Sequence, residues 1–210
     1  MILSNIEMQR AMAEGRLIIE PQPLPLLPTE GQKCPYDTHA VNLRLSEELS
    51  VPMSGPFTFD LMGGADFSEF LSRNSEKTTI QATGYALDKG KFVLGRTMEY
   101  INLPVDHPIN REEKVCLAAR IEGRSSIARC GVLVHFTAPT VHPGFEGTLT
   151  LEIINMGPAS FMLRPGMPIA QLIIEEVKGI PFEKTDTTFK GQTSPEGRVK
   201  ERKPKSTRSK

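Results

Sequence analysis

The stretch EGRSSIARCGVLVHFTAP, residues 122–139, sets the pattern of the fold. A glycine turn leads into two serines and then Ile-Ala-Arg, which predicts a single helical turn entered through a hydroxyl cap. The apolar, β-branched run that begins at Gly131 is typical of a strand. The stretch therefore predicts a turn, one helical turn and a short strand in succession.

The polar residues of this stretch allow two interpretations. Arg124 and Arg129 carry guanidinium groups that can fork onto phosphate or carboxylate oxygens, and helix N-termini attract phosphate. Ser125 and Arg129 are four residues apart, so they share one face of a helical turn. The alternative is a capped turn whose arginines face solvent. The pattern alone leaves both interpretations open.

Short apolar segments recur on both sides of this stretch, separated by Gly or Pro turns. Val41, Leu43 and Leu45 alternate with polar residues, which is typical of a half-buried strand. A turn at residues 88–90 separates two further predicted strands. The sequence has no Rossmann alternation and no Walker motif. A mainly β fold, either a sandwich or a barrel, is predicted from segments such as VCLAARIEG, GVLVHFTAP, GTLTLEIINMG, SFMLRPG and PIAQLIIEEV.

The N-terminus predicts a short helix. Ser4 is placed as the N-cap, Glu7 completes a capping box, and Gly15 provides the C-terminal stop. Four prolines in residues 17–31 then exclude helix and predict an extended loop. Residues 53–76 have a mixed pattern and are interpreted as a variable excursion from one domain spanning residues 1–193.

The net charge of zero hides an uneven distribution. Residues 198–210 hold seven Lys or Arg and one acid, so the rest of the chain has a net charge of −6. We therefore expect residues 194–210 to form a basic, disordered tail, and no nucleic-acid-binding fold in the body of the chain. The chain has no apolar run that would span a membrane and no signal-peptide pattern, which predicts a cytoplasmic protein.

The three cysteines, Cys34, Cys116 and Cys130, are odd in number and widely spaced. They predict reduced thiols rather than a disulfide framework or a zinc site. His135 and His142 are single histidines without metal-ligand spacing, and each is interpreted as structural rather than catalytic.

The segment HPGFEGTLTLEII, residues 142–154, contains a second candidate for chemistry. Alternation puts Leu149, Leu151 and Ile153 on one face, so Glu152 lies on the other face with Thr148 and Thr150. Glu152 is then either an exposed strand glutamate or an acid that lines a cavity. Gln171, in LRPGMPIAQLIIE, is compatible with an amide satisfied within a sheet.

These segments together resemble the dCTP deaminase family of the dUTPase-like superfamily. The similarity is carried by ILSNIEMQRAMAEGRLIIEP, VNLRL, GRSSIARCGVLVHFTAPTVHPGFEGTLTLEI, LRPGMPIAQLIIE and FKGQTSPEG, in the family's order and spacing. It covers residues 1–197, with residues 53–76 matched poorly. The resemblance implies a distorted β-barrel or jelly-roll-like fold of the dUTPase type, with few helices besides the first, assembled as a homotrimer with sites between subunits.

The resemblance also implies hydrolysis of dCTP to dUTP and ammonia, which feeds dTTP synthesis. The family works without zinc, and this chain lacks the H-x-E and P-C-x-x-C patterns of zinc deaminases. Magnesium would arrive on the triphosphate, and feedback inhibition by dTTP is a family property. Glu152 would be the general acid and base that activates water, a role for which a carboxylate of raised pKa is suited.

The remaining roles follow from the same resemblance. Ser125 and Arg129 would position water and polarise the pyrimidine, and the backbone around Ala138 would bind the base edge. Nucleotide contacts are implied for residues on three segments of the chain, namely Arg124, Ser125, Ser126, Ile127, Ala128, Arg129, His142, Thr150, Leu151, Glu152, Gln171 and Gln192.

The chain departs from the family pattern at four of these motif positions. His142 stands where the family has an Asp, which disfavours dUTPase or bifunctional activity. Asn42 replaces the Asp of VDLRL. Thr188 and Phe189 replace a Lys and a Tyr, which affects the phosphate contacts of the C-terminal segment. Two alternatives therefore stay open. The first is a dUTPase or a bifunctional dCTP deaminase/dUTP diphosphatase. The second is a non-catalytic, nucleotide-binding regulatory trimer.

Overall fold

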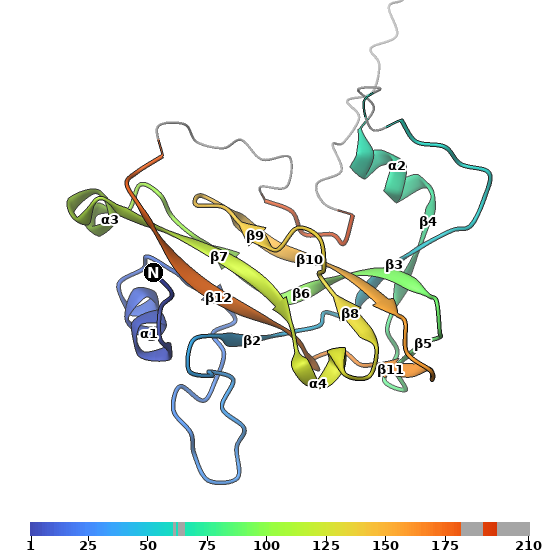
Figure 1. The fold of residues 1–210 in the computed structure, drawn as a ribbon, viewed down its shortest axis with the longest axis horizontal. Helices are drawn as coiled ribbons and strands as arrows, with labels where there is room; N and C mark the ends of the chain where they lie inside the picture. Colours follow the sequence, from blue (N-terminus) through green and yellow to red (C-terminus); the bar gives the residue numbers. More distant parts are fainter. Residues whose placement is uncertain (61, 63–65, 182–190, 197–210) are drawn as a thin grey trace, which may run out of the picture.

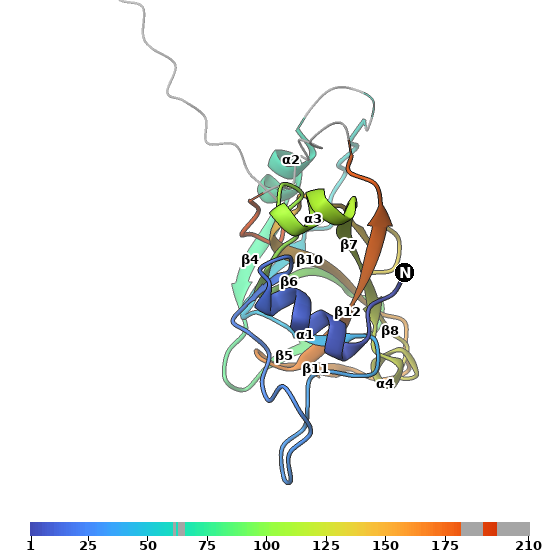
Figure 2. The ribbon, with the colours of Figure 1, turned by 90° about the vertical axis from the view of Figure 1, so that its left-hand side faces the viewer.

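The computed structural model of the chain describes residues 1–60, 62, 66–181 and 191–196. The predictions for Thr188, Phe189 and most of the basic tail concern residues outside these ranges. Within them, two larger antiparallel sheets lie face to face, and two short strands form a third sheet (Figures 1 and 2). The prediction of a mainly β fold is confirmed. The strand order of each sheet has two ends, so the sheets form an open, distorted sandwich and not a closed barrel.

The larger sheet has the order β4-β3-β6-β10-β8, and β1 pairs with the C-terminal end of β6. Its strands are β1 (Ile18–Glu20), β3 (Glu48–Pro52), β4 (Ser75–Thr79), β6 (Phe92–Asn102), β8 (Val132–Val134) and β10 (Glu146–Asn155). The second sheet has the order β2-β12-β7-β9. Its strands are β2 (Val41–Arg44), β7 (Val115–Gly123), β9 (Thr140–Val141) and β12 (Pro168–Lys178).

The core lies between the sheets and follows the predicted alternation. Leu149, Leu151 and Ile153 of β10 are buried, and they pack in one cluster with Val41 and Leu43 of β2. The side chains of Thr150 and Glu152 on the opposite face of β10 are only partly buried. Because neighbouring residues of a strand face opposite sides, burying the first set fixes the direction of the second.

The N-terminal helix, α1 (Asn5–Ala13), forms as predicted. The hydroxyl of Ser4 accepts a 3.3 Å hydrogen bond from the amide of Glu7, and Gly15 adopts a positive φ of 77° just after the helix. Met8 is fully buried, and Figure 2 shows α1 across one end of the two layers. The helix therefore covers one end of the core.

Residues 88–90 form the predicted turn between two strands, β5 (Tyr85–Leu87) and β6. β5 pairs with β11 (Phe161–Leu163), and β6 pairs with β10. One local prediction needs correction. The single helical turn is α4 (Ser125–Ala128), but its N-cap is Arg124 and no side chain caps it. The predicted hydroxyl cap is therefore wrong.

The excursion at residues 53–76 contains a helix that the sequence pattern did not predict. This helix is α2 (Phe67–Arg73), and Asp66 caps it by accepting a 3.2 Å hydrogen bond from the amide of Glu69. The ring of Phe59 packs against two rings of this helix, and its centroid lies 5.3 Å from that of Phe67 and 4.6 Å from that of Phe70. A fourth helix, α3 (Pro108–Glu113), precedes β7. The three cysteines are free, as predicted.

The burial of β10 predicts a large loss of stability when its inward face is truncated. Leu151→Ala should lower the free energy of unfolding by about 2–5 kcal/mol, because Leu151 is fully buried and its removal leaves a cavity. Urea denaturation of both proteins measures the difference. Leu27→Ala is the matched control, since Leu27 is 66% exposed and its loss should change stability by less than about 0.5 kcal/mol.

Candidate active site

The outward face of β10 places Glu152 in the wall of a cavity. Glu152 lies directly opposite Leu94 of β6, and Thr150 lies opposite Arg96. A register shift between Thr148 and Thr150 marks an irregularity in the strand two residues before Glu152. The cavity has a volume of about 460 Å³, and its walls include Ala138, His142, Thr150, Glu152 and Gln192. The structure thus brings together five of the predicted site residues.

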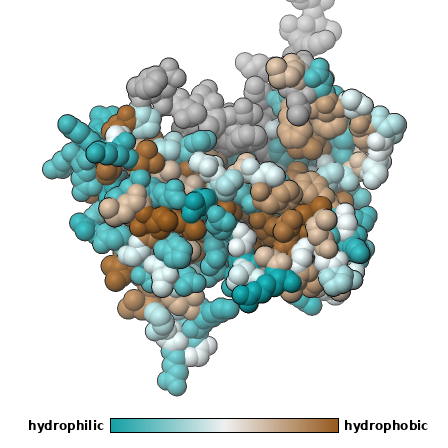
Figure 3. Space-filling model, viewed as in Figure 1, coloured by the Kyte–Doolittle hydropathy of each residue, from teal (hydrophilic) through white to brown (hydrophobic). Residues whose placement is uncertain are grey.

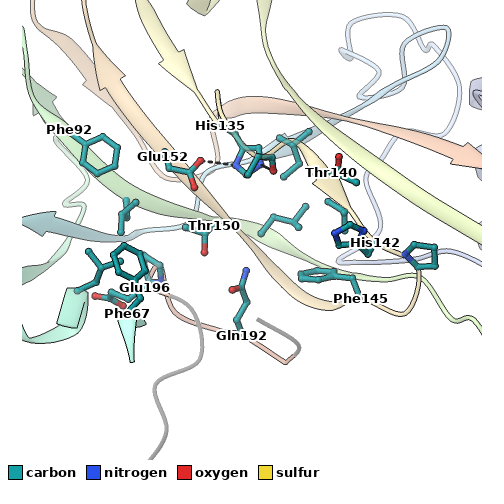
Figure 4. A pocket seen from close by; sticks show the side chains of 18 residues that line it. Phe67, Phe92, His135, Thr140, His142, Phe145, Thr150, Glu152, Gln192 and Glu196 are labelled. Carbon is teal, nitrogen blue, oxygen red and sulfur yellow. Dashed lines mark hydrogen bonds and ion pairs between the residues drawn. The ribbon is translucent and has the colours of Figure 1, made fainter. Parts of the chain in front are cut away.

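His135 is joined to Glu152 by both its backbone and its side chain. Its amide donates a 2.8 Å hydrogen bond to the carbonyl of Glu152, and its Nδ1 lies 2.9 Å from Oε2 of Glu152 (Figure 4). Its Nε2 lies 2.8 Å from the carbonyl oxygen of Ala138. His135 therefore bridges the predicted base and the backbone segment that was predicted to bind the substrate.

The backbone of His135 has a positive φ of 51°. This left-handed conformation is uncommon and unfavourable for a residue with a β-carbon, and it persists only where neighbouring contacts hold it. The contacts to Glu152 and Ala138 provide that support. His135 was interpreted as structural, and no pattern in the sequence predicts its contact with Glu152.

The contact changes the proton affinity of both side chains. Burial alone would raise the pKa of Glu152, but the contact with His135 and its positive charge outweigh burial and hold this pKa below its ordinary value. Burial alone would lower the pKa of His135, but Glu152 and the carbonyl of Ala138 raise it above its ordinary value. The expectation of a raised pKa for Glu152 is therefore wrong, and the reason is the histidine.

The described C-terminal segment closes one side of the cavity. Gln192 donates from Nε2 to the carbonyl of Thr148 at 2.7 Å, and its own carbonyl accepts from the amide of Thr148 at 3.1 Å. Gly147, beside this pairing, has a φ of 142°, and a β-carbon there would lie 2.9 Å from the carbonyl oxygen of Gln192. Only glycine allows the segment to approach β10 so closely.

Another part of the cavity wall is apolar. It includes Phe67 and Leu71 of α2 and Phe92 and Leu94 of β6. Glu196 of the C-terminal segment lies close to Phe67 (Figure 4). The excursion at residues 53–76 thus contributes directly to the candidate site. Sequence reasoning missed these residues, because contacts between α2, β6 and the C-terminal segment depend on the tertiary fold and leave no local pattern.

The residues of α4 do not line this cavity. Ser125, Ser126, Ala128 and Arg129 are exposed, and Arg124 and Ile127 are partly buried. Nη1 of Arg124 donates a 3.1 Å hydrogen bond to the carbonyl of Pro168. Figure 1 shows α4 beside β8, at the end of the molecule away from α2. The two halves of the predicted site are therefore separate within one chain.

Two further predicted residues also lie outside the cavity wall. Leu151 is fully buried in the core, so only its backbone is near the site. Gln171 lies on β12 between Asn42 of β2 and Glu122 of β7, in the other sheet.

Residues 1–60, 62, 66–181 and 191–196 contain no cluster of three or more His, Cys, Asp or Glu placed to hold a metal ion. No helix in these ranges is long and apolar enough to cross a membrane.

The pair of His135 and Glu152 predicts a pH-dependent contribution to stability. The raised pKa of His135 gives stability that is present below its unfolded pKa and lost as pH rises through the folded value. The lowered pKa of Glu152 gives stability that is lost as pH falls through its folded value. The pair should therefore stabilise most between the ordinary values of 4.5 for Glu152 and 6.5 for His135.

His135→Gln tests this window by urea denaturation across a pH series. The difference in unfolding free energy from the wild type should be largest at about pH 5–6 and should shrink towards about pH 9. His39→Gln is the control, since His39 is exposed and contacts only the neighbouring Thr38 among the described residues. A constant difference over the whole series would show that the two side chains are not coupled.

Comparison with known proteins identifies the family. The family model described as dCTP deaminase-like matches residues 2–177. A protein of Methanosphaera stadtmanae named "dCTP deaminase, dUMP-forming" is 32% identical over 95% of this chain and 94% of its own length. The "dCTP deaminase" of Rhodospirillum rubrum is 32% identical over 93% of this chain and 94% of its own length.

A solved structure agrees with the fold. The crystal structure of 2'-deoxycytidine 5'-triphosphate deaminase from Agrobacterium tumefaciens superposes with a TM-score of 0.58 at 19% identity. The match covers 84% of this chain and 47% of the other, so this chain spans about half of that protein. The family match and the relatives, which cover nearly the whole sequence, establish that the chain belongs to the dCTP deaminase-like family.

Proposed function

We propose that the protein hydrolyses dCTP to dUTP and ammonia, with Glu152 as the general acid and base. The observation that carries the proposal is the contact between Glu152 and His135 in the wall of a cavity of suitable size for a nucleotide. The names of the relatives, "dCTP deaminase, dUMP-forming" and "dCTP deaminase", support the choice of dCTP as substrate.

The proposed chemistry uses Glu152 in its ionised form. Its lowered pKa keeps it deprotonated at neutral pH, so it can accept a proton from water. The resulting hydroxide attacks C4 of cytosine, and Glu152 passes the proton it has accepted to N3. Glu152 then takes the proton of the new C4 hydroxyl and passes it to the amino group, so the C4 carbonyl forms, the C4–N bond breaks and ammonia leaves. His135 acts as a positioning residue that fixes the orientation of the carboxylate.

The base edge would bind near Ala138. The carbonyl oxygen of Ala138 already contacts Nε2 of His135, but a carbonyl oxygen has two lone pairs and can accept a second hydrogen bond. The amino group of cytosine is a suitable donor. This arrangement would place C4 next to Glu152, because His135 contacts both Ala138 and Glu152.

The phosphate contacts would come from α4 of a second copy of the chain. Arg124, Ser125, Ser126 and Arg129 supply charged and hydroxyl donors on an exposed element, away from the cavity of their own chain. The surface beside α4 is apolar over β8 (Figure 3), where Leu133 is 39% and Phe136 is 47% exposed. We propose a homotrimer in which this surface brings α4 to the neighbouring cavity.

Metal ions enter the proposal only through the substrate. Mg²⁺ would arrive bound to the triphosphate, as is usual for nucleotide substrates. The proposed reaction is independent of zinc, which is consistent with a sequence that lacks the H-x-E and P-C-x-x-C patterns.

Substitution of Glu152, the proposed general base, tests the proposed chemistry. Glu152→Gln should reduce ammonia release from dCTP by about 10²–10⁴-fold, because the amide cannot accept the proton of water. Circular dichroism should show an unchanged fold. Glu122→Gln is the matched control on an exposed position of β7 and should retain activity. Full activity of Glu152→Gln would exclude Glu152 as the base.

Mixing two inactive variants tests whether α4 of a second copy of the chain contributes to each site. Glu152→Gln and Arg129→Ala should each be inactive alone. Co-refolding them in equal amounts should restore activity at about one quarter of the sites, where an intact cavity meets an intact α4. A mixture of Glu152→Gln with Glu152→Ala is the control and should stay inactive. No recovery in the first mixture would show that each site lies within one chain.

A second candidate function is the formation of dUMP. Proteins of Methanosphaera stadtmanae and Methanobrevibacter smithii, 32% and 33% identical to this chain, are named "dCTP deaminase, dUMP-forming". His142, the residue that departs from the family's Asp, is exposed and lines the cavity. Release of pyrophosphate together with dUMP would favour this alternative, whereas accumulation of dUTP would favour the deaminase alone.

A further inference from the structure

Glu196 has an unusual environment for a carboxylate. Its side chain lines the same cavity as Glu152, and the residue is only 3% exposed. Neither Oε1 nor Oε2 has a hydrogen-bond partner among the residues that the structure describes. A buried carboxylate without partners is unfavourable, so an occupant of the cavity that donates a hydrogen bond to Glu196 would be stabilised.

The surroundings of Glu196 are apolar. Phe67 and Leu71 of α2 and Phe92 and Leu94 of β6 line this part of the cavity, and we call these four residues with Glu196 the α2 compartment. Leu94 lies directly opposite Glu152 in the sheet. In Figure 4 Glu196 lies beside Phe67, and Thr150 is drawn between Glu196 and Glu152. The compartment therefore begins next to the proposed base and ends at a second acid.

Contacts from elsewhere in the fold hold the walls of the compartment in place. Phe59 packs against Phe67, and Asp66 caps α2. The segment that carries Glu196 is anchored to β10 by the amide of Gly191, which donates to the carbonyl of Glu146 at 2.7 Å. The Gln192 contacts described above add to this anchor. The segment that carries Glu196 is thus held against β10 by backbone and side-chain hydrogen bonds.

We propose that the α2 compartment binds a hydroxymethyl group on C5 of cytosine, so that 5-hydroxymethyl-dCTP is a preferred substrate. This inference rests on the proposed function, which places C4 beside Glu152. Of the two ring atoms next to C4, N3 bears no substituent, so a group that projects beside the reacting carbon must be on C5. Its methylene carbon packs against Leu94 and Phe67, and its hydroxyl donates to Glu196.

The compartment distinguishes three related nucleotides by chemistry. A 5-methyl group fills the apolar part but leaves Glu196 without a donor. An unmodified ring leaves both the apolar walls and Glu196 uncontacted. A site built around a hydrogen bond to a substrate hydroxyl discriminates strongly against an analogue without it, because the buried polar group is then left unpaired. The comparison of hydroxymethyl with methyl therefore isolates Glu196.

Competition between nucleotides tests the proposal. Wild-type protein receives dCTP, 5-methyl-dCTP and 5-hydroxymethyl-dCTP in one equimolar mixture with Mg²⁺, and chromatography follows the loss of each. The ratio of kcat/KM for hydroxymethyl over methyl should be about tenfold or more. Glu196→Leu should bring this ratio close to one. Glu112→Leu, on the exposed face of α3, is the matched control and should keep the wild-type ratio.

Each outcome decides a separate question. Turnover of dCTP without a preference for hydroxymethyl over methyl overturns the α2 compartment and leaves the proposed function intact. Release of ammonia from none of the three overturns the proposed function. In that case, calorimetric titration with the same nucleotides tests the α2 compartment. Binding of 5-hydroxymethyl-dCTP about tenfold tighter than binding of 5-methyl-dCTP supports the compartment, and equal affinities overturn it.

A second variant tests the α2 compartment independently, in case Glu196→Leu does not fold. Leu71→Phe adds volume to the wall of the compartment from an element outside both sheets. It should lower kcat/KM for both 5-substituted nucleotides relative to dCTP by about tenfold, because the larger ring occupies the space of the substituent. Unchanged ratios in this variant would place the C5 group elsewhere and overturn the proposal.

Discussion

The pairing of β10 with β6 is the constraint on which the rest of the structure depends. β10 contributes Leu149, Leu151 and Ile153 to the core on one face and Thr150 and Glu152 to the cavity on the other. Since a slip of one residue would exchange the two faces, the free energy gained by burying the inward side chains also fixes the position of the proposed base. The beginning of the same strand holds the segment at Gln192, and its end pairs with β8, which leads to His135. Stability and function are thus linked through one strand.

The contact between His135 and Glu152 gives the site a different character from an isolated buried acid. Burial alone would favour the protonated carboxyl, which cannot accept a proton from water. The histidine reverses that preference, and its own left-handed backbone is held by the hydrogen bond from its amide to the carbonyl of Glu152. The strain at His135 is therefore compensated locally. An ionised carboxylate is suited to the first proton transfer of the proposed reaction. Its lowered pKa also favours the return of that proton to the leaving amine, because the return restores the charged histidine–carboxylate pair.

The sequence predicted the regular parts of the fold well because their determinants are local. Alternation identified β2 and β10, the Ser4 cap identified α1, and glycine and proline located the turns. Features that depend on distant contacts were not predicted. The strands flanking residues 88–90 pair with partners far along the chain, and α2, which packs against Phe59, has no strong periodic pattern in its sequence. For the site, alternation placed Glu152 on the polar face of its strand and the family resemblance assigned its role, but His135, Phe67 and Glu196 meet in the cavity only in the folded chain. A positive φ at a histidine has no signature in one sequence.

The elements around the cavity differ in how freely they can change. Glu152 and Thr150 lie on a central strand, so any substitution that shifts their backbone also disturbs the core. The walls formed by α2 and residues 191–196 lie outside the sheets and are attached by caps, one aromatic cluster and a few backbone hydrogen bonds. Segments of this kind tolerate substitution and commonly carry specificity, whereas the scaffold carries the shared chemistry. The fold therefore separates the proposed base, Glu152, from the residues that would select the pyrimidine, and a change of substrate would need no change in β10.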